Sequence, residues 1–152
     1  MTNKEIVISV HRSMGRNDAL SLRGKAIANE ITDTDIIENE HSVPKYDPKK
    51  DYTQVPIGSP YKFEGQVYAL IQPHNAAWYT NIAPGTEGGA PFWRIKHTKN
   101  PKNAKPWVQP TATSLYLEGE CMIWTDGNVM RAKRDTNFSP VEYPLDWEVV
   151  IA

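Results

Sequence analysis

Carboxylates and histidines are the side chains of this chain that could carry acid–base or metal chemistry. Glu64 and Glu118 each precede a glycine, and glycoside hydrolysis uses a pair of carboxylates. Both occupy the same place in a repeat described below, however, and equivalent positions in a repeat usually share a structural task. No two histidines have the spacing of metal ligands; they are His11, His41, His74 and His97. We therefore expect no catalytic residues, no cofactor and no metal site, and predict that the protein is not an enzyme.

Other chemical motifs give no stronger signal. Cys121 is the single cysteine and lies in an apolar run, so we expect a small buried hydrophobe instead of a nucleophile. The sequence contains no Gly-x-Ser-x-Gly, no P-loop and no dinucleotide-binding fingerprint. Acids are frequent in residues 30–40, but the spacing of Asp33, Asp35 and Glu38 does not fit a calcium-binding loop. This stretch predicts a solvated acidic connector.

The composition restricts the class of protein. Among 152 residues, 17 are basic and 18 acidic, which gives a net charge of −1. This balance argues against a nucleic-acid partner, which needs a clustered basic face. The 12 prolines, 9 glycines and 5 tryptophans favour short strands and turns over helices. The apolar run Ile6–Val10 is too short for a signal peptide and no stretch approaches a membrane span, so we expect synthesis in a cytoplasm and no membrane insertion.

Two strand pairs are predicted in the last hundred residues. Apolar runs near 121–124 and 129–132 flank Asp126-Gly127, a dipeptide typical of a two-residue type I′ hairpin turn. A second pair is expected near 65–71 and 76–82, joined by a turn at Gln72, Pro73, His74 and Asn75. Closer to the N-terminus, Ile6–Val10 predicts a strand, and 19–27, with Gly24 inside it, fits a strand with a bulge better than a helix.

The two strand pairs align as a repeat when the sequence is shifted by 54 positions. Glu118-Gly119 then falls on Glu64-Gly65, and Trp147 falls on Trp93. Tyr61 lies close to Tyr116, and the apolar runs coincide. We take six residues as the anchors of this repeat: Tyr61, Gly65, Trp93, Tyr116, Gly119 and Trp147. The alternative is two unrelated hairpins of similar length.

The fold class that we predict is mainly β, with two small three-stranded antiparallel β modules in tandem after an extended N-terminal anchoring segment. Residues 1–45 form this segment, 46–96 the first module, 97–106 a connector, and 107–152 the second module. Modules this small are marginal alone, so they share a core or lean on other chains. Four tryptophans are expected in the core: Trp93, Trp107, Trp124 and Trp147.

The order aromatic, Tyr-x-x-Gly, apolar strand, turn glycine, strand with alanine, proline and terminal tryptophan resembles the chitin- and cellulose-binding modules of carbohydrate-binding families 5 and 12. In the second repeat the matching residues are Trp107, Tyr116, Gly119, Met122, Gly127, Met130, Ala132, Pro140 and Trp147. In the first they are Tyr61, Gly65, Val67, Ala77 and Trp93. The resemblance covers about the last 100 residues. It implies compact three-stranded units that bind polysaccharide without catalysis.

In these families the ligand-binding aromatics usually follow the alanine of the second strand. Trp78-Tyr79 directly follows Ala77, so the resemblance implies a glycan platform there, to which we add His74 and Asn75 of the preceding turn. Such a pair supplies large, rigid contact area that can stack on the C–H face of a sugar. Strand alternation favours a different arrangement, with one ring in the core and one outside. The second repeat departs from the pattern, since Lys133-Arg134 follows its alanine.

Sugar-module-like repeats without a catalytic domain or export signal favour a bacteriophage virion protein, such as a head or tail fibre or decoration. Such a protein is assembled in the host cytoplasm and leaves by lysis. Residues 1–45 would bind other virion proteins, the chain would form a homo-oligomer, and the repeats would face host or surface glycans. Two alternatives remain: an architectural capsid or tail accessory protein without a glycan ligand, and the polysaccharide-binding accessory subunit of a chitinase-like system.

Overall fold

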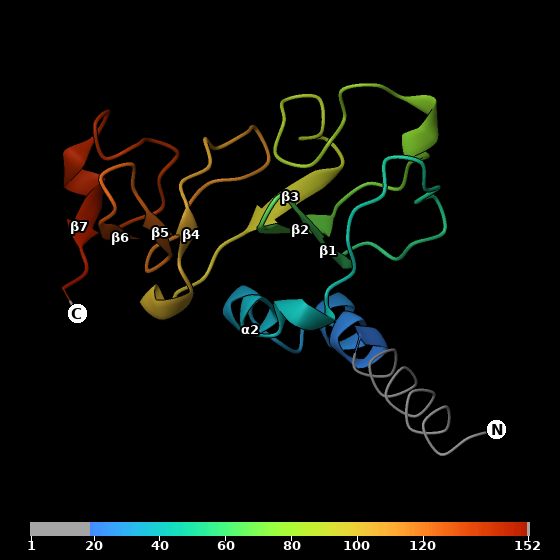
Figure 1. The fold of residues 1–152 in the computed structure, drawn as a ribbon, viewed down its shortest axis with the longest axis horizontal. Coiled ribbons are helices and arrows are strands. Elements are labelled where there is room, and N and C mark those ends of the chain that lie inside the picture. The colour runs from blue at the N-terminus through green and yellow to red at the C-terminus, as the bar shows by residue number, and fades with distance from the viewer. Residues whose placement is uncertain (1–18, 152) are drawn as a thin grey trace, which may run out of the picture.

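Residues 19–151 are described by a computed structural model, which is mainly β and contains two small sheets with a few short helices. The sheets lie side by side, with helix α2 below them and long loops above (Figure 1). The first sheet has the order β1-β2-β3 and the second the order β4-β5-β6-β7. The strands are β1 (Pro60–Phe63), β2 (Gln66–Leu70), β3 (Trp93–Lys96), β4 (Lys105–Pro106), β5 (Cys121–Ile123), β6 (Val129–Ala132) and β7 (Trp147–Val149). The strand expected at Ile6–Val10 lies outside the described residues.

The first sheet is an antiparallel meander whose central strand, β2, is buried along its whole length. Phe63 faces Gln66 across the hairpin, so only Glu64 and Gly65 form the loop. Their φ angles are 48° and 79°. Positive φ at both central residues is the requirement of a type I′ turn. The two-residue turn that the sequence predicts at Asp126-Gly127 is therefore found at Glu64-Gly65 instead.

The second sheet contains the expected hairpin but with a different turn and one more strand. Gly127 donates its N–H to the carbonyl of Trp124 at 2.9 Å, and Asn128 accepts from Trp124 at 2.9 Å. Gly127 has a φ of 87°, but Asp126 is not among the residues with positive φ, so this is a longer loop that ends in a left-handed glycine. β4 joins β5 in parallel, so the expected three-stranded antiparallel unit has a fourth strand.

The segment before the sheets is helical where we expected strand and connector. Residues 19–27 are helix, which corrects the bulged strand. Helix α2 (Asp33–Glu38) begins at a capping box, because the Thr32 hydroxyl accepts from Asp35 N–H and the Asp35 carboxylate accepts from Thr32 N–H. Acids in the first turn also match the positive end of the helix dipole. The acids between Ile31 and Ile37 thus favour the start of a helix. Comparing their spacing with that of a calcium-binding loop could not reveal this.

Helix α2 packs against the first sheet instead of standing in solvent. Ile36, Ile37 and Val43 are buried together with Val67 of β2. Asp33 binds Lys96 of β3 at 2.8 Å, with the Lys96 side chain only 6% exposed. Part of the segment 1–45, which we predicted to anchor the modules, therefore shares a core with β2. Its residues 1–18 lie outside the described residues.

The same three kinds of backbone hydrogen bond occur in each of the two sheets. In each, a left-handed glycine donates to the β-strand residue that faces the buried tryptophan, and an aromatic residue donates to the first strand of the meander. A tyrosine then donates to the segment that follows the second strand. The pairs are Gly58 to Leu70 and Gly119 to Ala132 (both 2.8 Å), Tyr46 to Lys62 (2.8 Å) and Trp107 to Ile123 (2.9 Å), and Tyr52 to His74 (2.7 Å) and Tyr116 to Thr136 (2.9 Å).

These bonds correct the register of the sequence repeat. Gly119 corresponds to Gly58, and the hairpin glycine Gly65 corresponds to Gly127, so the 54-position shift pairs the wrong glycines. Trp93 and Trp147 do correspond, since each faces the last residue of the preceding strand. The cause is a difference in loop length, because β2 and β3 are joined by a longer loop than β6 and β7. The extra residues of this loop bring the two tryptophans to a separation of 54 positions, although the corresponding glycines are farther apart. Tyr116 likewise corresponds to Tyr52 and not to Tyr61.

Each sheet covers one face with an aromatic cluster of the same geometry. We call Tyr46, Tyr52, Phe63 and Trp93 the first cluster, and Trp107, Tyr116, Trp124 and Trp147 the second. A buried tyrosine meets the tryptophan edge-to-face in both, with ring centroids 5.1 Å apart in the first and 5.3 Å in the second. Such aromatic pairs stabilise beyond their buried area. Trp93 and Trp147 are buried as expected, whereas Trp107 and Trp124 are half-buried.

The corresponding tyrosines also bind backbone with their hydroxyls. Asp47 N–H donates to Tyr52 Oη at 2.8 Å, and Val108 N–H donates to Tyr116 Oη at 3.2 Å. Tyr52→Phe and Tyr116→Phe keep the ring but leave each N–H without an acceptor. We expect each variant to lose about 1–2 kcal/mol of unfolding free energy in urea titrations. Tyr143→Phe, at a half-exposed ring outside both clusters, is the control and should stay within about 0.5 kcal/mol of wild type. Equal stability of all three would contradict the shared role.

Candidate binding surface

Trp78 and Tyr79 are both exposed, which differs from the strand alternation that we favoured. Trp78 is 78% exposed and Tyr79 53%. Ala76–Trp78 is a single turn of 3-10 helix, η2, so the strand expected near 76–82 does not form. Rings on successive residues of such a turn need not alternate between core and solvent as on a strand. The pair of adjacent exposed aromatics is the most conspicuous apolar feature of this loop.

Asn75 and His74 hold η2 in place from below. The Asn75 side chain caps η2 by accepting from Ala77 N–H at 3.1 Å. His74 is only 5% exposed, and its ring lies 4.2 Å from that of Phe92 and 5.4 Å from that of Tyr52. Its Nδ1 lies 3.0 Å from the Gln72 carbonyl. His74 is therefore buried beneath this surface as part of the core, whereas Asn75 is half-buried at its edge.

The loop after η2 is compact and depends on glycine. Tyr79 packs at its inner side on Phe92, with ring centroids 6.0 Å apart. A Cβ on Gly88 would collide with the Asn81 carbonyl oxygen, and one on Gly89 with the Ala83 carbonyl oxygen. Backbone approaches this close fix the path of residues 80–92 back to β3. The exposed rings are thus carried by a tightly folded loop.

The corrected register removes the family-based reason for choosing these rings. Ala77 lies in η2 and not at the end of a second strand. The residue that corresponds to Ala132 is Leu70, because each is the strand residue that faces the buried tryptophan. Ile71-Gln72 therefore corresponds to Lys133-Arg134, and neither sheet carries an aromatic pair at that position. The case for Trp78-Tyr79 now depends on their exposure and support.

Two titratable groups with displaced pKa values, His97 and Glu120, lie at the junction of the two sheets. Burial lowers the pKa of His97 to about 3, and its ring stacks on Tyr116 at 3.7 Å. Burial raises the pKa of Glu120 to about 7, against the hydrogen bond from Leu117 N–H at 2.6 Å. Over residues 19–151 no group of three or more metal-ligating side chains is found. Glu64 and Glu118 lie in different turns, so they are not equivalent positions as the 54-position shift implied.

A second exposed apolar set was not singled out from the sequence. It follows β6 on the loop to β7 and consists of Phe138, Val141, Tyr143 and Leu145, of which Val141 is 75% exposed and Leu145 65%. The sequence did offer a signal for exposure, because these apolar residues alternate with prolines and polar side chains instead of forming an apolar run. We call this set the 138–145 patch.

Comparisons with known proteins and the search for a membrane span give no assignment. Neither the models of known protein families nor the curated proteins include a match to this chain. Within the part of the chain that the structure describes, no helix is both long and apolar enough to cross a membrane.

The junction predicts a pH effect on stability. The pKa of Glu120 is raised from 4.5 to about 7 by folding, so its ionisation disfavours the folded state increasingly as the pH rises from 4.5 to 7. Glu120→Gln cannot ionise. We expect its melting temperature relative to wild type to increase across this pH range and to level off above it. The measurement is a series of thermal melts, with Glu118→Gln as the exposed control. A difference between Glu120→Gln and wild type that does not depend on pH would contradict the assignment.

The buried His97 acts in the opposite direction and over a lower range. Its pKa falls from 6.5 to about 3 on folding, so its contribution is complete above pH 6.5 and is lost as the pH falls toward 3. We expect the difference in unfolding free energy between wild type and His97→Gln to shrink on acidification over this window. Urea titrations at successive pH values measure it. His41→Gln, at an exposed histidine, is the control.

Proposed function

We propose that this protein is a non-catalytic polysaccharide-binding protein in which Trp78 and Tyr79 form the ligand-contacting surface. The observation that carries the proposal is the exposure of two adjacent rings on a braced turn. An exposed tryptophan has no stabilising contact of its own to justify its position, and exposed aromatics mark interaction sites. A sugar chain can stack its C–H faces on these rings while its hydroxyls keep their bonds to water.

We also propose that the two sheets are tandem copies of one module that resembles carbohydrate-binding families 5 and 12. Support comes from the hydrogen bonds and aromatic clusters that the sheets share. In the corrected register, Gly65, Tyr68 and Leu70 of the first copy take the motif positions. They correspond to Gly127, Met130 and Ala132 of the second copy. The second copy has no counterpart of Trp78, so in this proposal the first copy binds and the second is structural.

The setting that we propose is a virion, on a head or tail fibre or a decoration, with residues 1–45 as the attachment segment. The reason for this proposal is the combination of binding modules with no catalytic constellation among residues 19–151, which is an analogy at the level of the fold. The described part of this segment contacts both sheets. Asp33 of α2 binds Lys96 of the first sheet, and Glu40, just after α2, binds Lys105 of the second sheet at 2.9 Å. An attachment segment fixed in this way would orient the modules outward.

A purely architectural role is the second candidate, and the 138–145 patch is the observation that favours it. Four exposed apolar side chains on one loop suit a contact with a neighbouring subunit. If this contact forms homo-oligomers, Val141→Asp with Leu145→Asp should lower the molar mass seen in sedimentation velocity at fixed protein concentration. The binding of polysaccharide by each chain should not change.

The proposed function predicts opposite outcomes at two tryptophans. Trp78→Ala should lose binding to insoluble chitin, cellulose or host cell-wall material, while unfolding free energy changes by less than about 0.5 kcal/mol. Trp147→Ala should lose about 3–5 kcal/mol, because it removes a buried ring and leaves a cavity. The measurements are pull-down isotherms and urea titrations. Lys133→Ala, an exposed position of the second sheet, is the control and should alter neither.

The result that would sink the polysaccharide proposal is specific. It is a wild-type protein that binds none of these materials, together with a Trp78→Ala variant that unfolds far more easily than wild type. Trp78 would then be a structural ring covered in the native assembly, and the architectural candidate would replace the proposed function.

A further inference from the structure

A groove between the two sheets has the features of a second ligand site, separate from Trp78 and Tyr79. It has a volume of about 500 Å³. One wall is the β1–β2 turn with Tyr68 behind it, the second is the loop 83–86, and the third is 106–108 at the start of the second sheet. We call it the inter-sheet groove. Its walls come from both halves of the chain, so it exists only when the two sheets are placed side by side.

Two hydrogen bonds fix the walls relative to each other. Gln66 Nε2 donates to the Pro106 carbonyl at 3.1 Å, and Lys105 Nζ donates to the Gly65 carbonyl at 2.7 Å. Lys105 is in turn bound by Glu40 at 2.9 Å. The groove is therefore formed before any ligand arrives, which lowers the entropic cost of binding.

Tyr68 places a polar group at the back of this groove. Its side chain is 4% exposed, and burial, with the nearby Glu64 carboxylate, raises its pKa to about 12. The hydroxyl stays neutral at ordinary pH, and Tyr68 is one of the residues that line the groove. Gly85 faces this hydroxyl, and a Cβ there would collide with it. Glycine at this position keeps the hydroxyl uncovered.

The remaining lining sets the chemistry of the ligand. Phe63 and Trp107 offer aromatic surface, and Glu64 adds a carboxylate at the rim, whereas no lysine or arginine of the described chain, 19–151, lines the groove. Pro84 and Pro106 have no N–H, so neither offers a backbone donor to a ligand. A ligand that fits must donate several hydrogen bonds, stack on aromatic rings and carry no negative charge. Neutral sugars meet all three conditions, whereas a proline-rich peptide offers mainly acceptors.

We propose that the inter-sheet groove binds a neutral oligosaccharide segment, with Tyr68 Oη and the Glu64 carboxylate as hydrogen-bond partners and the rings of Phe63 and Trp107 as stacking surface. The site differs from the exposed pair in position and residues. The two proposals therefore fail independently. A chain with both sites would hold a polysaccharide at two points and gain avidity from their linkage.

The test is an NMR titration of the full chain carrying Trp78→Ala and Tyr79→Ala, which removes the exposed pair. The probes are the hexamers of N-acetylglucosamine, cellulose, mannan and amylose at millimolar concentration, with decaproline as the peptide. We expect at least one sugar to shift the Gly65 and Gly85 amide signals and the Trp107 indole signal. Adding Tyr68→Phe should weaken that binding about tenfold with an unchanged melting temperature, since one hydrogen bond is lost. Tyr143→Phe is the matched control and should leave the affinity unchanged.

Three outcomes would overturn the groove site. The first is no shift at these signals with any of the sugars. The second is a shift with decaproline alone, which would make the groove a peptide site. The third is a sugar affinity that Tyr68→Phe and Glu64→Gln both leave unchanged. In each case binding by the wild-type protein that depends on Trp78 would still stand, so the two failures are distinguishable.

Discussion

The edge-to-face contact between a buried tyrosine and a buried tryptophan is the interaction on which each half of this molecule depends. Tyr52 meets Trp93 and Tyr116 meets Trp147, and each tyrosine also binds the backbone of the segment that precedes it. Sheets this small cannot bury a large aliphatic core. Two large rings per sheet replace it, and the same contact fixes the segment before the meander, the turn glycine and the last strand.

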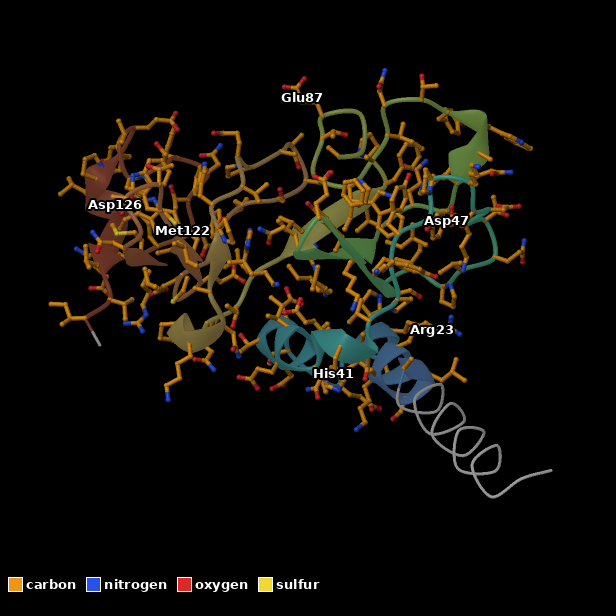
Figure 2. The ribbon with its side chains drawn as sticks, viewed as in Figure 1. Arg23, His41, Asp47, Glu87, Met122 and Asp126 are labelled. Atoms are coloured by element: carbon orange, nitrogen blue, oxygen red, sulfur yellow. The ribbon has the colours of Figure 1, made fainter. Side chains whose placement is uncertain are left out.

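The arrangement of the two sheets follows from polar contacts at their junction. Helix α2 binds Lys96 at the end of the first sheet, and Glu40 binds Lys105 at the start of the second. Gln66 of the first sheet also donates across this junction, to the Pro106 carbonyl. Figure 2 shows Arg23 and His41 at the lower side and Asp47 and Glu87 among the upper loops, with Met122 in the second sheet and Asp126 in the loop between β5 and β6. The helix at 19–27 and α2 therefore lie on one side of the sheets, whereas the loop that carries Trp78 lies on the other (Figure 1).

Much of the β content could be predicted from the sequence, because turn glycines and short apolar runs are local signals. The hairpin around Asp126-Gly127 and the central strand at 66–70 were found in this way. The register between the two halves could not be predicted, since it depends on which strand residue faces each buried tryptophan. A loop of different length between Leu70 and Trp93 made the wrong pair of glycines align. The helix at 19–27 was missed because its apolar face is completed only by α2 and Val67. Trp78 and Tyr79 were identified from their place after Ala77 in the family pattern, which the corrected register does not support. The inter-sheet groove had no sequence signal, because its walls are far apart in the chain.

The central claim is that Trp78 contacts polysaccharide while the corresponding buried rings hold the fold. Protein labelled with fluorotryptophan gives one fluorine resonance for each of the 5 tryptophans. Titrating it with soluble oligosaccharide should move the Trp78 resonance, assigned by Trp78→Phe, and leave those of Trp93 and Trp147 in place. No change at Trp78 under conditions where the protein is retained by the insoluble polysaccharide would contradict the claim.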